Sequence, residues 1–265
     1  MIYRAYIKLV ACFLLLSVVL SFWLGCARSE IPEGSSTTPG DIPAVGTPKK
    51  RVALTFDDGP HNVRTKAIVD ELNKYGYHAT FFVVGDRVDG TSYNGKAGIS
   101  YAIEAGNEIG IHGYTHRAYY DKCDDSTYRY ELNETLKAIT NISRGYNVRL
   151  MRPVGGKISD ERKAESEYSV IMWSVDSEDW KYKYSDDAPE SEKQEKLNTI
   201  VNNVMSLVKD GSIILMHDIY ISTVDAVKVI LARLNAEGYE VVTVSELIGD
   251  DLKPGTSYSQ WGTSW

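Results

Sequence analysis

Four residues of the 265-residue chain have the types and spacing of a catalytic metal site. Asp57 and Asp58 end the apolar run 52–56 before a Gly-Pro turn, and neighbouring strand residues point in opposite directions, so they should have different roles. His112 and His116 are four residues apart, which on one helical turn converges both rings on one point. One carboxylate and two imidazoles suit a divalent cation and leave positions open for water and substrate. Taken singly, the Asp pair could be only a turn or cap, and the His pair only structural.

Three further polar clusters follow apolar runs. Arg152 and Asp176 would each be a costly lone charge beside a buried strand. We therefore expect them to pair with one another or with an active-site carboxylate, the alternative being a purely structural ion pair. His217 follows the apolar run 213–216; a lone histidine is usually a satisfied core or surface residue, but in this company we interpret it as a general acid.

The elements that position these clusters are short β-branched runs that alternate with amphipathic stretches from Arg51 onward, a pattern that predicts βα units around parallel strands. The expected strands are Val52–Phe56, Thr80–Val84, Glu108–Ile111, Arg149–Met151, Val170–Trp173, Ile213–Met216 and Glu240–Thr243. Apolar stripes over 197–208 and 224–234 predict two of the helices. This pattern indicates an α/β fold, a barrel of the TIM type that is complete or incomplete, with its chemistry at the carboxyl ends of the strands.

Both ends of the chain differ from this pattern. Residues 1–26 have the layout of an export signal, with Arg4 and Lys8, an apolar stretch over 9–24, then Gly25 and Cys26. A lipid anchor at Cys26, an uncleaved membrane anchor and ordinary cleavage all stay open, and each places the domain outside the cytoplasm. Residues 27–49 are predicted to be a flexible linker and 50–249 the globular domain.

Residues 250–265 are predicted to be a mobile polar tail. Trp261 and Trp265 could instead stack on sugar rings, which is the less favoured interpretation.

Composition excludes several classes of protein. The formal net charge is −7 and the sole Lys/Arg cluster is 49–51, so nucleic acid is not expected as a partner. Cys123 is the one cysteine in the body of the chain, so a disulfide cannot stabilise the domain. The length suits one core, and we expect a monomer.

The five clusters, in this order, resemble the motifs of the polysaccharide deacetylases of carbohydrate esterase family four. They are 55–60 (TFDDGP), 112–116 (HGYTH), 152–153 (RP), 176–180 (DSEDW) and 215–217 (LMH). The likeness covers about 51–248 and is closest to the peptidoglycan N-acetylglucosamine deacetylases. It implies a deformed, seven-stranded (β/α) barrel that hydrolyses N-acetyl groups on amino sugars of an extracytoplasmic polysaccharide. The domain would be held at the outer face of the cell membrane by the N-terminal segment.

The resemblance also implies one divalent metal ion, Zn²⁺ before Co²⁺ or another ion. Its ligands would be Asp58, His112 and His116, with Asp57 as catalytic base and His217 as acid.

Further roles follow from the same resemblance. Arg152 would orient the base, and Asp176 would hold Arg152. Substrate would contact the backbone near Gly155, the ring of Trp180 and, through its acetyl methyl, Leu215.

The chain departs from the family pattern at two positions. Gly113 stands where the family usually has Ser or Thr, which predicts a looser histidine loop and lower metal affinity. The family's Arg-Pro-Pro-Tyr-Gly is here Arg-Pro-Val-Gly-Gly, so Gly155 replaces the tyrosine and changes the expected pocket wall.

Other functions fit the residues less well. A glycoside hydrolase needs two separated carboxyl groups, which the adjacent Asp57 and Asp58 do not supply well. A non-haem iron oxygenase would need a co-substrate site that the sequence does not reveal. A sugar-binding module would need neither a base nor an acid. Among deacetylases, chitin oligosaccharides and acetylated xylan are the alternative substrates.

Overall fold

The computed structural model describes residues 49–90 and 95–264. The expected signal or anchor segment 1–26, with Cys26, and the expected linker as far as residue 48 lie outside these ranges, as does Trp265. Within the described part of the chain, no helix is long and apolar enough to cross a membrane.

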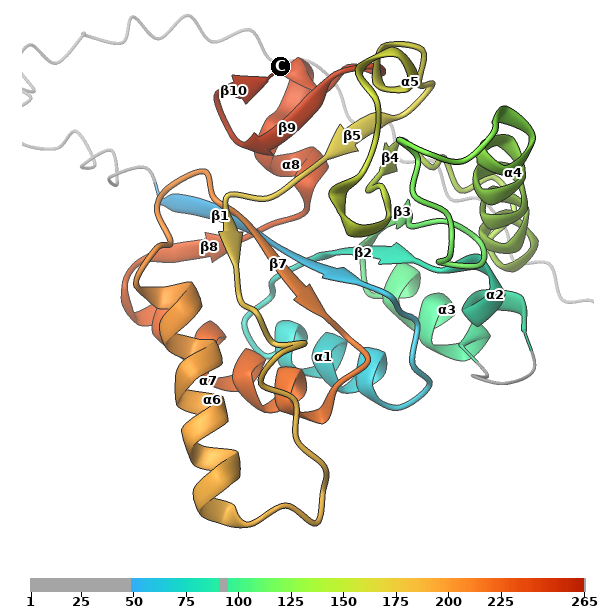
Figure 1. The fold of residues 1–265 in the computed structure, drawn as a ribbon. Helices are drawn as coiled ribbons and strands as arrows, with labels where there is room; N and C mark the ends of the chain where they lie inside the picture. Colours follow the sequence, from blue (N-terminus) through green and yellow to red (C-terminus); the bar gives the residue numbers. More distant parts are fainter. Residues whose placement is uncertain (1–48, 91–94, 265) are drawn as a thin grey trace, which may run out of the picture. The chain divides into compact units, whose positions relative to one another are not determined.

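A ten-stranded sheet, mostly parallel, forms the centre of the domain (Figure 1). Its strands are β1 (Lys50–Asp57), β2 (Thr80–Val83), β3 (Glu108–Ile111), β4 (Leu150–Met151), β5 (Ser169–Ile171), β6 (Val175–Asp176), β7 (Ile213–His217), β8 (Tyr239–Val241), β9 (Ser257–Gln260) and β10 (Thr263–Ser264). Their order is β10-β9-β5-β4-β3-β2-β1-β7-β6, and β8 pairs with the start of β1. The sheet curls into a half-barrel, which confirms the predicted α/β class with a deformed (β/α) barrel.

Strand β1 is the central element. From Val52 to Asp57 every residue is buried, because apolar side chains alternate between the two faces and both faces are covered. Parallel pairing sets Asp57 opposite His217 of β7, and β6 pairs with β7 so that Asp176 lies opposite Leu215. The register therefore brings four predicted site residues to one edge of the sheet.

Helices cover the sheet and connect its strands. They are α1 (Arg64–Asn73), α2 (Gly85–Asp89), α3 (Lys96–Glu104), α4 (Asp125–Ile142), α5 (Asp160–Ala164), α6 (Glu190–Met205), α7 (Ile221–Ala236) and α8 (Val244–Ile248), with short 3-10 turns η1 (Val154–Gly156) and η2 (Gly249–Asp251). The predicted apolar stripe of α7 is buried along its whole length. In α6 the buried face ends with Val204, and Leu207, expected on this face, lies beyond the helix and is exposed.

The seven expected strands are all present, Glu108–Ile111 with the predicted bounds and the other six with shifted ends, and three more were not predicted. The expected strand Val170–Trp173 is β5 and ends at Ile171; the chain then bends and resumes as β6 against β7. Two-residue strands such as β6 are too short to leave an alternating pattern in the sequence.

The expected mobile tail is wrong for the residues before Trp265. Strand β9 pairs in parallel with β5, and Tyr258 is buried in the smaller of two apolar clusters. Its hydroxyl donates to the carbonyl of Asp251 at 2.5 Å and accepts from the N–H of Lys253 at 3.0 Å. The polar composition of this segment did not predict a strand, because the segment docks on the edge of the sheet through one buried aromatic ring.

Candidate metal-dependent active site

The predicted polar clusters meet at the carboxyl ends of β1, β3, β4, β6 and β7. They line one hollow of about 450 Å³, to which Asp57, His112 and His217 belong. The topological rule for barrels, that chemistry lies where parallel strands end, accounts for this convergence.

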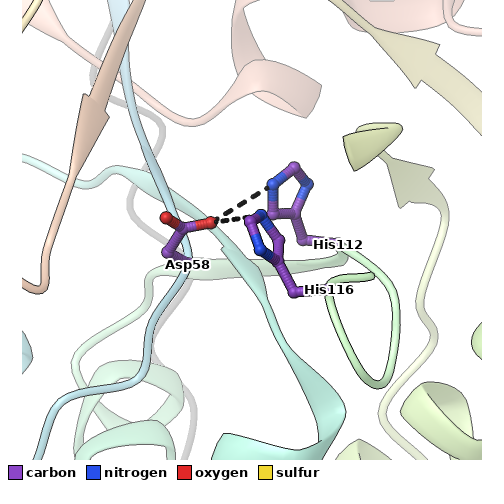
Figure 2. Close-up of side chains that lie close together, drawn as sticks. All are labelled: Asp58, His112 and His116. Carbon is purple, nitrogen blue, oxygen red and sulfur yellow. Dashed lines mark ion pairs between the residues drawn. The ribbon is translucent and has the colours of Figure 1, made fainter. Parts of the chain in front are cut away.

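Asp58, His112 and His116 point toward a common centre (Figure 2). Asp58 Oδ1 lies 2.8 Å from His116 Nε2 and 3.5 Å from His112 Nε2, and the three candidate ligand atoms all fall within 4.8 Å of one another. A tetrahedral zinc site with bonds of about 2.0–2.2 Å has neighbouring ligand atoms roughly 3.3 Å apart. The spacing therefore suits such an ion.

The protonation pattern also suits a cation. Nδ1 of His112 lies 2.8 Å from the carbonyl oxygen of Arg152, so this nitrogen donates and Nε2 keeps its lone pair for a ligand bond. Burial works to raise the pKa of Asp58, but His112 and His116 hold it well below its ordinary value. Asp58 Oδ1 is buried, and no described residue donates a well-formed hydrogen bond to it. An ionised, unsatisfied oxygen between two imidazoles is what a divalent cation would complete.

Backbone strain is concentrated at this site. Among the described residues other than glycine, those with positive φ are Asp58 (71°), His116 (58°) and Glu178 (55°). Such conformations cost about 1–3 kcal/mol each and persist where the surroundings impose them. Two of the three residues are candidate metal ligands, and the third belongs to the 176–180 cluster.

A buried arginine holds the neighbouring carboxylate. Arg152 Nη1 donates to Asp57 Oδ1 at 2.8 Å, while its other nitrogens donate to the carbonyls of Ile171 and Met172. Burial lowers the pKa of Arg152, and the charge of Asp57 opposes that shift. Asp57 Oδ1 is thus engaged by Arg152, whereas Asp57 Oδ2 lies 3.6 Å from His112 Nε2.

Asp176 does not have the expected contact with Arg152. Its carboxylate accepts a hydrogen bond from the N–H of Glu178 at 2.8 Å, and only its charge acts on the guanidinium. Backbone carbonyls hold the guanidinium instead, because Arg152 directly follows β4 and its donors reach Ile171, the last residue of β5, and Met172, the residue after it.

Asp179, missed in the sequence, holds the imidazole of His217. Its Oδ1 lies 2.7 Å from His217 Nδ1, and its Oδ2 accepts from the N–H of His217 at 2.7 Å and from Thr223 Oγ1 at 2.6 Å. Burial is the largest single influence and works to lower the pKa of His217, but the hydrogen bond and charge of Asp179, together with the charges of Asp57 and Asp58, raise it to about 9. The sequence cluster 176–180 contains both Asp176 and Asp179, and only the deeper burial of Asp179 distinguishes the two.

A second missed residue, Glu131, supports the histidine loop. From the buried face of α4, its carboxylate accepts hydrogen bonds from the N–H groups of Tyr114 and Thr115, at 2.6 and 2.8 Å, and from the Thr115 hydroxyl. Gly113 has φ 84°, and a Cβ there would lie 3.0 Å from Glu131 Oε2. The loop thus has support that does not depend on a side chain at 113, while the looser loop and lower metal affinity expected from that glycine stay predictions.

The turn after Asp58 has a comparable constraint. A Cβ on Gly59 would lie 2.2 Å from the buried carboxylate of Asp218, which accepts a hydrogen bond from Thr65. Only glycine allows this approach.

The predicted substrate contacts all line the hollow. Leu215 is buried, whereas Trp180 is 46% exposed at the rim. Gly155 has φ 58°, and a Cβ on it would lie 3.2 Å from the ring of Tyr119. Tyr119, from the segment after His116, therefore forms the wall at the position where Gly155 has no side chain.

These contacts define an α/β half-barrel with candidate metal ligands at its strand ends. The profile of the family named Polysaccharide deacetylase matches residues 44–169. The chain belongs to this family.

Two relatives place the chain within the family. It is 40% identical over 199 residues to the peptidoglycan-N-acetylmuramic acid deacetylase PdaC of Bacillus subtilis, covering 75% of this chain and 39% of PdaC. It is 33% identical to the peptidoglycan-N-acetylglucosamine deacetylase PgdA of Listeria monocytogenes over 84% of this chain and 44% of PgdA. The chain thus spans less than half the length of these two relatives.

Solved structures agree with the fold. The structure of PdaC matches with a TM-score of 0.66 and 38% identity over 76% of this chain and 90% of that one. A family 4 acetyl xylan esterase from Clostridium thermocellum, in complex with a cobalt ion, matches with a TM-score of 0.69 and 29% identity over 81% of this chain and all of that one.

Proposed function

We propose that this chain removes N-acetyl groups from amino sugars of peptidoglycan by metal-dependent hydrolysis. The observation that carries the proposal is the single hollow in which Asp58, His112 and His116 lie between a carboxylate held by arginine and an imidazole held by aspartate. Family membership supports the reaction type, and the activities of PdaC and PgdA support the substrate.

The chemistry of amide hydrolysis requires these groups. An amide is a poor electrophile with a poor leaving group, so water needs activation, the carbonyl needs polarisation and the amine needs a proton. When bound by Asp58, His112 and His116, a divalent cation, Zn²⁺ before Co²⁺, would polarise the carbonyl and acidify a water molecule.

Residues of the chain perform the remaining tasks. Asp57 takes the proton of the attacking water, and Arg152 fixes which oxygen is free to do so. His217, kept protonated by Asp179, donates to the departing amine. The N–H of Gly155 stabilises the developing oxyanion. Leu215 contacts the acetyl methyl and Trp180 the sugar ring.

Competing functions have less support. A glycoside hydrolase would use a carboxylic acid as proton donor, whereas Asp57 is held by Arg152 and the group on the other side is an imidazole. Chitin oligosaccharides and acetylated xylan stay the alternative substrates, the latter because of the similarity to the acetyl xylan esterase.

We further propose extracytoplasmic action, because the relatives' substrate is peptidoglycan. Attachment through residues 1–26, lipidation of Cys26 and a monomeric state stay predictions from the sequence.

The deciding experiment is acetate release from purified peptidoglycan, chitin oligomers and acetylated xylan. We expect release from peptidoglycan to be fastest, to stop after chelation and to return with added Zn²⁺ or Co²⁺. Faster release from xylan would identify acetylated xylan, and not peptidoglycan, as the substrate. Full activity in the demonstrably metal-free protein would overturn the mechanism.

A further inference from the structure

A second hollow, of about 630 Å³, adjoins the candidate active site. Tyr220, the residue before α7, lines both hollows. The remaining walls come from the first residue of α1, the start of α6 and the segment between β6 and α6, which Figure 1 shows as a long loop beside α6. A polymer held at the metal ligands can therefore extend past Tyr220 into this space.

The second hollow is basic, although the chain has a net charge of −7. It is lined by Arg64, Lys183 and Lys196 against Asp187 and Glu192. Lys196 pairs with Glu192 at 2.6 Å, so this charge is already compensated. The carboxylate of Asp187 accepts a hydrogen bond from the neighbouring Ser185 hydroxyl.

The other two cations keep capacity for a ligand. Arg64 Nη1 donates to the carbonyl of Ile219 at 2.6 Å, and Lys183 Nζ lies 5.5 Å from the ring centre of Tyr220. Neither cation has a carboxylate within ion-pair distance in the part of the chain that the structure describes. A guanidinium with free donors beside a lysine ammonium is a site for a carboxylate.

The first hollow has the opposite character. It contains the carboxylates of Asp57, Asp58 and Asp176, and so it disfavours an anionic group outside the metal position. A substrate that carries a carboxylate would thus be oriented by repulsion on one side of Tyr220 and attraction on the other.

We propose that the basic hollow binds a carboxylate carried by the glycan, through Arg64 and Lys183, and thereby directs the enzyme to acidic polysaccharide in preference to neutral. This inference rests on the proposed function and specifies its substrate class. Two sources of the carboxylate share this chemistry: the lactyl group of an N-acetylmuramic acid residue, and the peptide attached to that group.

The test compares four soluble substrates of matched length. They are a muramic-acid-containing glycan with free lactyl carboxylates, the same glycan with these groups amidated, the same glycan with its peptides, and an N-acetylglucosamine oligomer. Acetate release is measured for the metal-loaded wild-type protein, Arg64→Gln and Lys183→Gln. Lys137→Gln is the control, because this exposed lysine of α4 lines neither hollow.

We expect each hollow variant to lose about three- to tenfold in kcat/KM on the carboxylate glycan, mainly through KM, as partly exposed charged contacts do. On the amidated glycan and the neutral oligomer, the hollow variants should have the kcat/KM of the wild-type protein. The control variant should match wild type on every substrate. The loss of kcat/KM on the carboxylate glycan should become smaller in high salt, because exposed charges are screened beyond about 8 Å at physiological ionic strength.

The outcomes separate the possibilities. A loss confined to the peptide-bearing glycan would identify the peptide as the source of the carboxylate. Equal losses on acidic and neutral substrates, or no loss on either, would overturn the inference while leaving deacetylation intact. Absence of acetate release by the wild-type protein from every substrate would instead count against the proposed function.

Discussion

At the scale of single residues, the two adjacent carboxylates at the end of β1 have different surroundings. Asp57 is held by the guanidinium of Arg152, whereas Asp58 faces two imidazoles and adopts a left-handed backbone conformation. Because Asp58 turns out of the strand that Asp57 ends, the pair can supply both the proposed base and a proposed metal ligand. Substitutions that remove one function should therefore spare the other.

Asp57→Asn should keep the metal and lose most turnover. Removing a general base costs about 10²–10⁴-fold in rate, and the amide still fits beside Arg152. Metal content by elemental analysis and kcat on peptidoglycan together measure this. Activity within a few fold of wild type would contradict the role of Asp57.

Asp58→Asn and His112→Ala should instead lose the metal. Groups that only orient a ligand contribute about 10- to 100-fold to metal affinity, so loss of a ligand should cost roughly a hundredfold or more. Titration with Zn²⁺ in the presence of a competing chelator measures the affinity. Unchanged affinity in both variants would exclude this cation site.

His217 should titrate at about pH 9 in the metal-free protein, because Asp179 raises its pKa above the ordinary value of 6.5. The imidazolium is then the main form at neutral pH, as a general acid requires. A raised histidine pKa stabilises the fold fully below pH 6.5, and this stabilisation disappears as pH rises through about 9.

Asp179→Asn should lower the pKa of His217, since burial then acts with less opposition. NMR titration of the imidazole measures the change. Asp176→Asn is the matched control, because that carboxylate makes no hydrogen bond to the ring among the described contacts, and it should have a smaller effect. Equal shifts in the two variants would contradict the assignment of Asp179.

At the scale of elements, the histidine loop depends on a helix that contributes no residue to the chemistry. Helix α4 begins at its cap Asp124, whose side chain accepts from the N–H of Thr127, and it presents Glu131 on its buried face. The carboxylate of Glu131 ties two N–H groups and one hydroxyl of the loop between the candidate ligands. Helix α4 thus constrains the loop that carries the two imidazoles.

Glu131→Gln should weaken metal binding about tenfold, because the amide keeps the shape but loses the charge that orders the loop. The affinity is again measured by Zn²⁺ competition, with thermal unfolding to verify the fold. Glu134→Gln, at the partly exposed carboxylate that pairs with Lys137 on the same helix, should leave the affinity unchanged. If the two variants behave alike, Glu131 has no positioning role.

At the scale of the whole domain, the half-barrel brings together residues up to 160 positions apart, from Asp57 to His217. Its far edge is completed by β9, which buries Tyr258 against the sheet. The C-terminal segment is therefore part of the described fold and should contribute to its stability.

Tyr258→Ala should destabilise the domain by about 3 kcal/mol, as loss of a buried aromatic ring does, and lower Tm by roughly 6–12 °C. Trp261→Ala is the control, since this ring is 53% exposed and its removal should cost under about 1 kcal/mol. Differential scanning calorimetry compares the two. A Tyr258 variant as stable as wild type would mean that β9 is dispensable.

The sequence by itself determined the parallel α/β pattern, the order of the polar clusters and the presence of Asp57, Asp58, His112, His116 and His217 at the ends of apolar runs. These features are local, because burial imposes alternation on strands and a charge is tolerated only where a strand ends.

Only the tertiary structure decided which carboxylate pairs with Arg152 and which pairs with His217. Asp179 and Asp176 are alike in the sequence, yet one is fully buried under His217 and the other lines the hollow. The support from Glu131, the ring of Tyr119 against Gly155 and the docking of β9 likewise follow from packing between distant segments. The electrostatic environment of a side chain depends on groups that the fold brings together, and that proximity has no local pattern.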